Sequence, residues 1–164
     1  MNDELLNLIR EYAKKYGIDP AIVYGICQTE SNFDQYACRY EPDYQYIENT
    51  AIHKPASSTH QTERFFQKCS WGVMQVMGGV FRQYQYRGWL SKIPENLHIQ
   101  LDYGCRHLSS KINRYGLDRG ILSYNSGSPV KRNGRYINEK YLEKVLKYSR
   151  EYPKKFCELM KGVL

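Results

Sequence analysis

The stretch from Leu97 to Tyr115 constrains the fold more than any other part of the 164-residue chain. Its apolar residues recur at spacings of four, four, three, four and three, which is the repeat of one face of an α-helix. Pro94 is expected to open this helix and Gly116 to close it. Because an amphipathic helix of this length is stable only when its apolar face is covered, other elements must pack around it.

The rest of the chain is also largely helical in pattern. Further helices are predicted over residues 3–16, 20–31, 80–86 and 119–125. A last helix is predicted from Asn138, with an apolar face formed by Leu142, Val145, Ser149, Tyr152, Phe156 and Leu159.

Capping and breaking residues give the expected limits of these helices. Asp19 and Asp118 are the expected N-caps of two of them. Gly78 and Gly79 are expected to interrupt the chain after the short apolar element 71–76. Pro153 is expected to kink the last helix.

Residues 38–70, called the excursion below, break the helical pattern. They include Pro42 and Pro55 and few aliphatic residues, so short helical or hairpin pieces are predicted there. The tip, 54–59, has almost nothing to bury and is predicted to be mobile. A loop of this length is usually functional, and we predict a lid or wall beside a cleft; the alternative is a surface insertion that merely tolerates length. The whole chain, 1–164, is thus predicted to be one mostly α domain with at most a small β element in residues 38–70.

The composition argues against a membrane protein and favours an anionic partner. No apolar run approaches the roughly 20 residues of a membrane span, so stable membrane insertion is not expected. The 24 Lys and Arg exceed the 17 Asp and Glu, and a basic surface attracts nucleic acid, anionic lipid or an acidic wall polymer; simple solubility is the alternative. The 16 Tyr residues add flat faces with polar tips, which suit sugar rings or bases. The acidic start, Met1 to Glu4, leads directly into an amphipathic pattern, so synthesis in the cytoplasm without a signal peptide is expected.

The cysteines and histidines indicate neither a disulfide framework nor a metal site. The cysteines are Cys27, Cys38, Cys69, Cys105 and Cys157. Their number is odd and they lack metal-ligand spacing, so free thiols are predicted and no metal or cofactor is expected. Cys38 and Cys69, at the two ends of the excursion, are the pair that could still form a bridge.

Glu30 is the strongest candidate for acid–base chemistry. It ends the apolar helix 20–31, where burial and the partial negative charge of the helix C-terminus both raise the pKa of a carboxyl group. A carboxyl that stays protonated near neutral pH can act as a general acid. The alternative is a solvated Glu at a frayed helix end.

Four short motifs connect Glu30 to a known family. In chain order they are Glu30-Ser31, the Ser-Trp-Gly-Val-Met-Gln segment 70–75, the Ser-Tyr-Asn-Ser-Gly segment 123–127, and Tyr141-Leu142. This order resembles the soluble-type lytic transglycosylases and the related goose-type lysozymes. Val73 and Ser123 stand where the family usually has Leu and Ala, and the excursion makes the first spacing longer than usual. Residues 39–42, Arg-Tyr-Glu-Pro, resemble a variant found in phage and prophage members.

The resemblance implies a lysozyme-like fold with a substrate cleft, and cleavage of the β-1,4 bond between N-acetylmuramic acid and N-acetylglucosamine in peptidoglycan. Glu30 would be the one catalytic residue, where most glycosidases use two carboxylates. It would protonate the leaving oxygen and then accept a proton from the muramic C6 hydroxyl, which gives a 1,6-anhydro end. The implied substrate-binding residues are Ser31, Ser70, Met74, Gln75, Tyr124, Asn125 and Tyr141.

These residues carry different implied roles. Ser31 would orient Glu30 or bind a substrate group, and Tyr124 and Tyr141 would hold Glu30 or the substrate through their phenols. The amides of Gln75 and Asn125 would bind N-acetyl and hydroxyl groups. Met74 is expected to form part of the cleft wall.

Two other functions remain open at this point. A second carboxylate near Glu30, with Glu41 and Asp43 as the candidates, would permit the hydrolysis typical of a goose-type lysozyme. A basic, Tyr-rich domain with the loop 131–135 could instead bind nucleic acid. We expect the partner to be a peptidoglycan glycan strand and not nucleic acid, the protein to be a monomer, and delivery to the wall to be by phage release or from a virion.

Overall fold

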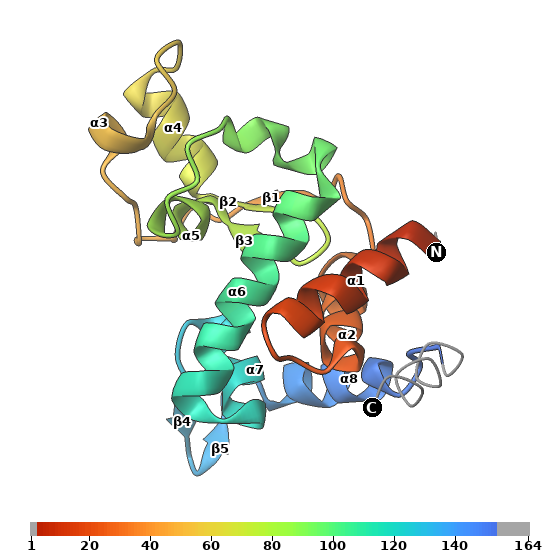
Figure 1. Ribbon diagram of the computed structural model, residues 1–164. Coiled ribbons are helices and arrows are strands. Elements are labelled where there is room, and N and C mark those ends of the chain that lie inside the picture. Colours follow the sequence, from red (N-terminus) through yellow and green to blue (C-terminus); the bar gives the residue numbers. More distant parts are fainter. Residues whose placement is uncertain (1–2, 154–164) are drawn as a thin grey trace.

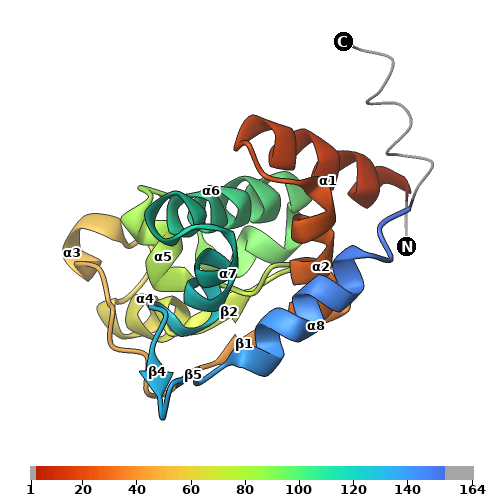
Figure 2. The ribbon, with the colours of Figure 1, turned by 90° about the horizontal axis from the view of Figure 1, so that it is seen from below.

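Helix α6 (Leu97–Tyr115) lies at the centre of the computed structural model, which describes residues 3–153 (Figure 1). Helices α1 (Asp3–Lys15) and α7 (Leu117–Ser126) pack directly on it. Helix α2 (Pro20–Ser31) packs on α1 and, along its other side, on α8 (Glu139–Ser149). Figure 2 shows α8 alongside α2, so the last helix of the described residues packs on an early one.

The apolar periodicity of the sequence forms the core between these helices. The fully buried side chains include Ile9, Ile26, Leu101, Leu108 and Ile121. The close approach of α2 and α8 requires a glycine at position 25, because a Cβ atom on Gly25 would clash with the carbonyl oxygen of Val145. The predicted mostly α fold is confirmed.

A small antiparallel sheet joins the two ends of the excursion. Its strands are β1 (Cys38–Tyr40), β2 (Cys69–Trp71) and β3 (Val76–Met77), in the order β1-β2-β3. Arg39 pairs with Ser70, and Ser70 pairs with Met77. The sheet therefore extends past residue 70, because the chain turns back after β2 and adds β3 to its other edge.

The excursion also contains two helices, α3 (Thr50–His53) and α4 (His60–Gln67). They lie beside α5 (Gly78–Gln83) in the upper left of Figure 1. At the tip, Ser58 is the one buried residue, and the Thr59 hydroxyl caps α4 by accepting a hydrogen bond from the Thr62 N–H. The mobility expected of the tip stays a prediction.

Several predicted helix limits are wrong. Asn96 caps α6, while Pro94 lies in the preceding 3-10 helix η1 (Leu90–Glu95). Asp118 lies inside the first turn of α7, and Gly116 takes the cap position. The apolar element does end just before Gly78, but Gly78 and Gly79 form the first turn of α5, so that helix begins two residues earlier than predicted and ends at Gln83.

The C-terminal predictions are tested only in part. Helix α8 ends at Ser149, so Pro153 lies beyond its end and does not kink it. The predicted face residues Phe156 and Leu159, and Cys157, fall outside the described residues. The basic loop forms a hairpin of β4 (Lys131–Arg132) and β5 (Arg135–Tyr136).

The four described cysteines are free thiols, which confirms the prediction for Cys27, Cys38, Cys69 and Cys105. Cys38 and Cys69 lie on adjacent strands, where their thiols form a hydrogen bond but no disulfide. Among residues 3–153, no group of three or more His, Cys, Asp and Glu side chains is arranged to hold a metal ion. Over the same residues, no helix combines the length and the apolar character needed to cross a bilayer.

Candidate active site

Glu30 lies in the last turn of α2, where the buried face of the helix ends. Asn32 then takes a left-handed conformation and donates its N–H to the carbonyl oxygens of Cys27 and Gln28, which ends the helix. The phenol of Tyr141, in the first turns of α8, donates a hydrogen bond to Oε1 of Glu30 over 2.5 Å. The packing of α8 on α2 thus brings together two residues that are 111 positions apart.

Burial raises the pKa of Glu30 above that of an ordinary glutamate. The hydrogen bond from Tyr141 acts in the opposite direction, as do the positive charges of Arg39 and Lys144, but burial is the larger effect. The predicted direction of the shift is therefore confirmed. A carboxyl with a raised pKa, a fixed orientation and nearby cations can give up a proton and then exist transiently as an anion.

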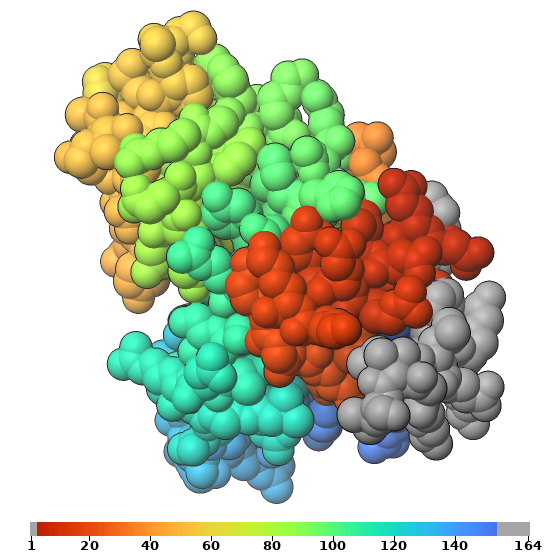
Figure 3. All heavy atoms as spheres, viewed as in Figure 1, coloured from red at the N-terminus to blue at the C-terminus, as the bar shows by residue number. Residues whose placement is uncertain are grey.

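Glu30 opens into a cavity of about 670 Å³, which is within the size range of ligand pockets. One side is formed by the excursion and the segment after it, and the other by α6, the end of α7 and the loop after it. In Figure 3 the gold-to-green part of the surface meets the teal part at an indentation. The excursion contributes Arg39, Glu41, Tyr44, Tyr46, Glu48 and Ser70 to the cavity lining, so the prediction that it borders the cleft is confirmed. Its tip, 54–59, is not part of this lining.

The Glu-Ser motif fixes the chain at the base of the cavity. The Ser31 hydroxyl donates to the carbonyl oxygens of Val73, at 2.9 Å, and of Cys27, at 3.3 Å. It therefore ties the end of α2 to the loop between β2 and β3. The structure shows this positioning contact for Ser31, and not a contact with Glu30.

Ser70 and Gln75 also hold each other in place. Both line the cavity, and the Ser70 hydroxyl donates to Oε1 of Gln75 at 2.8 Å. The Gln75 amide nitrogen donates to the carbonyl oxygens of Ala37, at 3.0 Å, and Gly72, at 2.9 Å. Polar groups that were expected to face a ligand are thus used to hold the turn between β2 and β3.

The other predicted residues divide between the cavity and the core. Met74 is fully buried and does not line the cavity, and its carbonyl oxygen accepts a hydrogen bond from the Tyr124 phenol at 2.7 Å. Tyr124 lines the cavity but holds the backbone of Met74, so Tyr141 is the phenol that contacts Glu30. Asn125 lines the cavity and is exposed.

The two suggested second carboxylates differ in position. Glu41 lines the cavity and forms an ion pair with Arg39. Asp43 is exposed and is not part of the lining. Glu48, which the sequence reasoning did not single out, is a further carboxylate in the lining.

Sequence reasoning also missed two residues of α6. His107 and Lys111 line the cavity one helical turn apart. Burial lowers the pKa of His107 to about 4, and the Tyr84 phenol lies 3.3 Å from its Nδ1. Their spacing of four residues places them on one face of the helix. This spacing is the sequence feature that could have identified them.

The fold and the site together define a class: a lysozyme-like helical domain in which a partly buried carboxyl group opens into a cleft. Residues 7–146 match the family described as Transglycosylase SLT domain. The chain belongs to this family, which confirms the resemblance inferred from the four motifs.

A shorter segment is similar to two curated proteins with the same name. Over 35 residues the chain is 49% identical to membrane-bound lytic murein transglycosylase C of Mannheimia succiniciproducens. Over 35 residues it is 54% identical to the protein of that name from Haemophilus influenzae. Each match covers 21% of this chain and 10% of the relative, so the similarity spans about a tenth of the relatives' length.

Proposed function

We propose that this chain is a peptidoglycan lytic transglycosylase that cleaves the β-1,4 bond between N-acetylmuramic acid and N-acetylglucosamine with Glu30 as its one catalytic residue. The observation that carries the proposal is the carboxyl of Glu30, which is partly buried, bound by Tyr141 and open to the cavity. Family membership supports the reaction class. The chain would act as one catalytic domain.

Glu30 performs both proton transfers in the proposed reaction. Its protonated carboxyl first donates the proton to the glycosidic oxygen, the bond from that oxygen to C1 breaks, and the bonding electrons leave with the oxygen. The Glu30 carboxylate then accepts the proton of the muramic C6 hydroxyl as O6 bonds to C1. The product is a 1,6-anhydro end, Glu30 is protonated again, and no water is consumed.

The surrounding groups favour both protonation states in turn. Burial raises the pKa of Glu30 and so favours its protonated form before the reaction. The Tyr141 hydrogen bond and the charges of Arg39 and Lys144 then stabilise the carboxylate that forms after the first proton transfer. Asn125 is exposed in the lining, and although its amide oxygen accepts a hydrogen bond from Asn138, its amide N–H groups can donate to hydroxyl or N-acetyl oxygens.

The remaining predicted residues act on the shape of the site in this proposal. Ser31 joins the turn between β2 and β3 to α2, and Ser70 and Gln75 hold the turn itself. Met74 and Tyr124 join that turn to α7 through one hydrogen bond. Substrate contacts by these five residues are therefore expected to be secondary to their positioning roles.

Hydrolysis of the same bond is the second candidate, because Glu41 and Glu48 line the cavity that holds Glu30. A lysozyme-type reaction needs a second carboxylate to activate water or to act as a nucleophile. Glu41 is already engaged in an ion pair with Arg39, whereas Glu48 lines the cavity without an ion pair among the described residues. Delivery of the enzyme by a phage, a monomeric state and the absence of nucleic-acid binding stay predictions.

The test is digestion of purified peptidoglycan, with the released muropeptides analysed by mass spectrometry. Glu30→Gln is expected to fold and to lose roughly 10²–10⁴ in rate or more, because the amide cannot transfer a proton. Glu143→Gln is the matched control, since Glu143 is an exposed carboxyl outside the cavity lining. A folded Glu30→Gln protein with wild-type lysis would disprove the role of Glu30.

The same digestion separates the two candidate reactions. A transglycosylase product is about 18 Da lighter than the hydrolysed product, because it lacks one water. In heavy-oxygen water, anhydro products take up no label, whereas hydrolysis places the heavy oxygen at C1. Labelled ends would establish the lysozyme-type reaction instead. A gel shift with single-stranded DNA tests the nucleic-acid alternative.

A further inference from the structure

We infer that the segment Tyr44–Glu48, called the wall segment below, is a sugar-binding subsite in which the ring of Tyr46 stacks on a pyranose ring of the glycan. The identity of the ligand rests on the proposed function. The subsite itself rests on three observations: an exposed aromatic ring in the cavity lining, a buried polar network that holds its backbone, and a glycine that leaves room for it.

Tyr46 is the most exposed large hydrophobic side chain among the described residues, at 80% of its full accessible surface, although it lines the cavity. Tyr44, beside it, is partly buried and meets the Tyr46 ring nearly edge-on, with 5.7 Å between the ring centroids and 68° between the planes. One tyrosine thus supports the other. A supported, exposed aromatic face offers an apolar surface to the C–H face of a sugar at low entropic cost.

The backbone of the wall segment is held by Gln67 of α4. The Glu48 N–H donates to Oε1 of Gln67 at 2.7 Å, and the Gln67 amide nitrogen donates to the Glu48 carbonyl oxygen at 3.2 Å. This reciprocal pair fixes the end of the segment as a strand partner would. The Gln67 side chain is fully buried, so its orientation is set by its other contacts.

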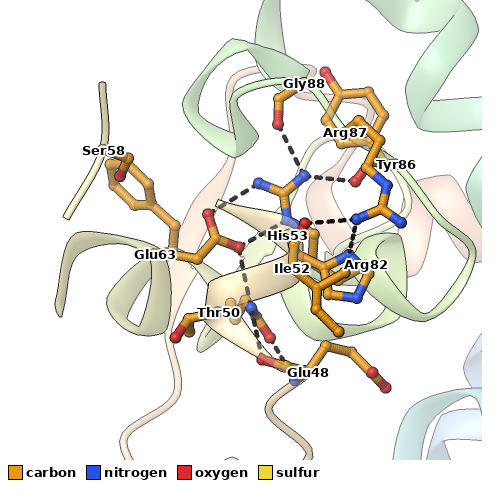
Figure 4. A network of polar contacts seen from close by, with 12 residues as sticks. Glu48, Thr50, Ile52, His53, Ser58, Glu63, Arg82, Tyr86, Arg87 and Gly88 are labelled. Carbon is orange, nitrogen blue, oxygen red and sulfur yellow. Dashed lines mark hydrogen bonds and ion pairs between the residues drawn. The ribbon is translucent and has the colours of Figure 1, made fainter. Parts of the chain in front are cut away.

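The buried ion pair of Glu63 and Arg82 provides those contacts (Figure 4). The Gln67 amide nitrogen also donates to Oε1 of Glu63 at 3.0 Å, and Glu63 accepts two hydrogen bonds from Arg82, at 2.7 and 2.9 Å. Arg82 in turn donates to the carbonyl oxygens of Tyr86 and Gly88. Because both charges are excluded from water, each group has one low-energy arrangement. If the excursion were only a surface insertion, nothing would require these contacts to end at a residue that lines the cavity.

Gly79 seats the wall segment on α5. A Cβ atom at this position would clash with the carbonyl oxygen of Tyr46 and would lie 2.8 Å from the Tyr44 hydroxyl. The segment therefore lies directly against the helix backbone. Gly79 has no positive φ angle in the structure, so the close approach, and not the backbone conformation, is what requires glycine here.

The chemistry of the lining fits a neutral, hydroxyl-rich ring. Asn125, Ser126 and Ser128 also line the cavity, and their amide and hydroxyl groups can form hydrogen bonds with hydroxyl and N-acetyl groups. The Glu48 carboxylate, also in the lining, forms none of the ion pairs found among the described residues and can accept from sugar hydroxyls. An aromatic face with such groups around it is suited to one N-acetylhexosamine unit, bound apart from the unit at Glu30.

Tyr46→Ala and Tyr46→Phe test the subsite, and they carry little folding risk because the side chain is exposed. With peptide-free glycan strands as substrate, Tyr46→Ala is expected to raise KM roughly three- to tenfold and leave kcat unchanged, because stacking is lost. Tyr46→Phe keeps the ring and should keep the wild-type KM. Tyr36→Ala is the control, since Tyr36 is 66% exposed and lies outside the cavity lining.

Binding is measured separately in the Glu30→Gln background, by calorimetry with the same glycan strands. The added Tyr46→Ala change should weaken Kd by the same factor. This measurement does not depend on catalysis, so it distinguishes a wrong subsite from a wrong catalytic assignment. Unchanged affinity on Tyr46→Ala, or an equal loss on Tyr36→Ala, would overturn the subsite.

Gly79→Ala tests whether the position of the wall segment matters. It is expected to raise KM for glycan strands as Tyr46→Ala does, because the new methyl group displaces the segment from α5. Ser110→Ala, on the exposed side of α6, is the control. Gly17→Ala is unsuitable, because Gly17 has a positive φ angle and the substitution would strain the backbone. A folded Gly79→Ala protein with wild-type KM and kcat would show that the seating of the segment has no role in binding.

Discussion

The helices and the excursion bury different kinds of side chain. In the helical region formed by α1, α2, α6, α7 and α8, most buried side chains are apolar, among them Ile9, Leu101 and Leu108. Between residues 41 and 67 the buried side chains are His53, Ser58, Glu63 and Gln67, all of them polar. Apolar packing thus holds the helical side of the cavity, and buried polar contacts hold the side formed by the excursion.

The difference matters because apolar packing and a buried polar network respond differently to substitution. Apolar packing is non-directional, so a substitution that preserves volume is tolerated. A buried polar network is directional, and loss of one partner leaves a charge without compensation in a medium of low polarity. We therefore expect the helical region to respond gradually to substitution and the excursion to respond sharply.

Arg82→Met is the largest expected effect on stability. It leaves the Glu63 carboxylate buried without its partner, which costs about 3–5 kcal/mol in the free energy of unfolding. Leu108→Met introduces the same side chain into the helical core and should cost less than about 1.5 kcal/mol. Urea unfolding followed by circular dichroism measures both.

A double variant sharpens this comparison. Glu63→Leu combined with Arg82→Met removes both charges, so it should recover part of the loss. The recovery is expected to be incomplete, because the carbonyl oxygens of Tyr86 and Gly88 also lose their donor. Equal costs for Arg82→Met and Leu108→Met would show that the two regions do not differ in this respect.

Tyr141→Phe is the next effect in size, and it acts on the helical side of the cavity. The Tyr141 hydrogen bond lowers the pKa of Glu30, so its removal raises that pKa further. Because the reaction requires protonated Glu30, activity falls as pH rises through this pKa. The alkaline limb of the pH–activity profile should therefore move to higher pH in the variant. Hydrogen bonds to charged groups contribute about 1.5–3 kcal/mol, so kcat/KM should fall by roughly ten- to a hundredfold.

The measurement is the pH profile of kcat/KM on peptidoglycan. Tyr148→Phe, on the same helix, is the control and should keep the wild-type profile, because Tyr148 lies outside the cavity lining. An alkaline limb that stays in place, or moves to lower pH, would contradict the assigned effect of Tyr141 on Glu30.

Replacement of the tip is the smallest expected effect. Residues 54–57 lie outside the cavity lining, so an equal length of Gly and Ser should change muropeptide release by less than about twofold, as for most surface changes. Ser58 and Thr59 stay in place, because one is buried and the other caps α4. A larger loss with unchanged stability would show that the tip does act as a lid.

Most of the helices and the identity of the catalytic candidate could be predicted from the sequence. The helix predicted over Leu97–Tyr115 and the N-cap predicted at Asp19 depend on contacts within a few residues, and both were confirmed. The limit near Pro94 was wrong because Asn96, two residues later, caps α6. The limit near Gly78 was wrong, and there the glycine packs against the backbone of another segment. The excursion offered little periodicity, so its helices and its buried polar side chains had no pattern to reveal them.

The sequence by itself determined the helices outside the excursion, the family and the place of Glu30 at a helix end, because backbone hydrogen bonds and apolar faces repeat within one or two turns. Only the tertiary structure decided which phenol reaches Glu30, since Tyr141 is 111 residues away and Tyr124 fits the sequence pattern equally well. It also decided that Glu63 pairs with Arg82, 19 residues later. Directional contacts of this kind depend on the final positions of both partners, and those positions follow from the packing of the whole chain.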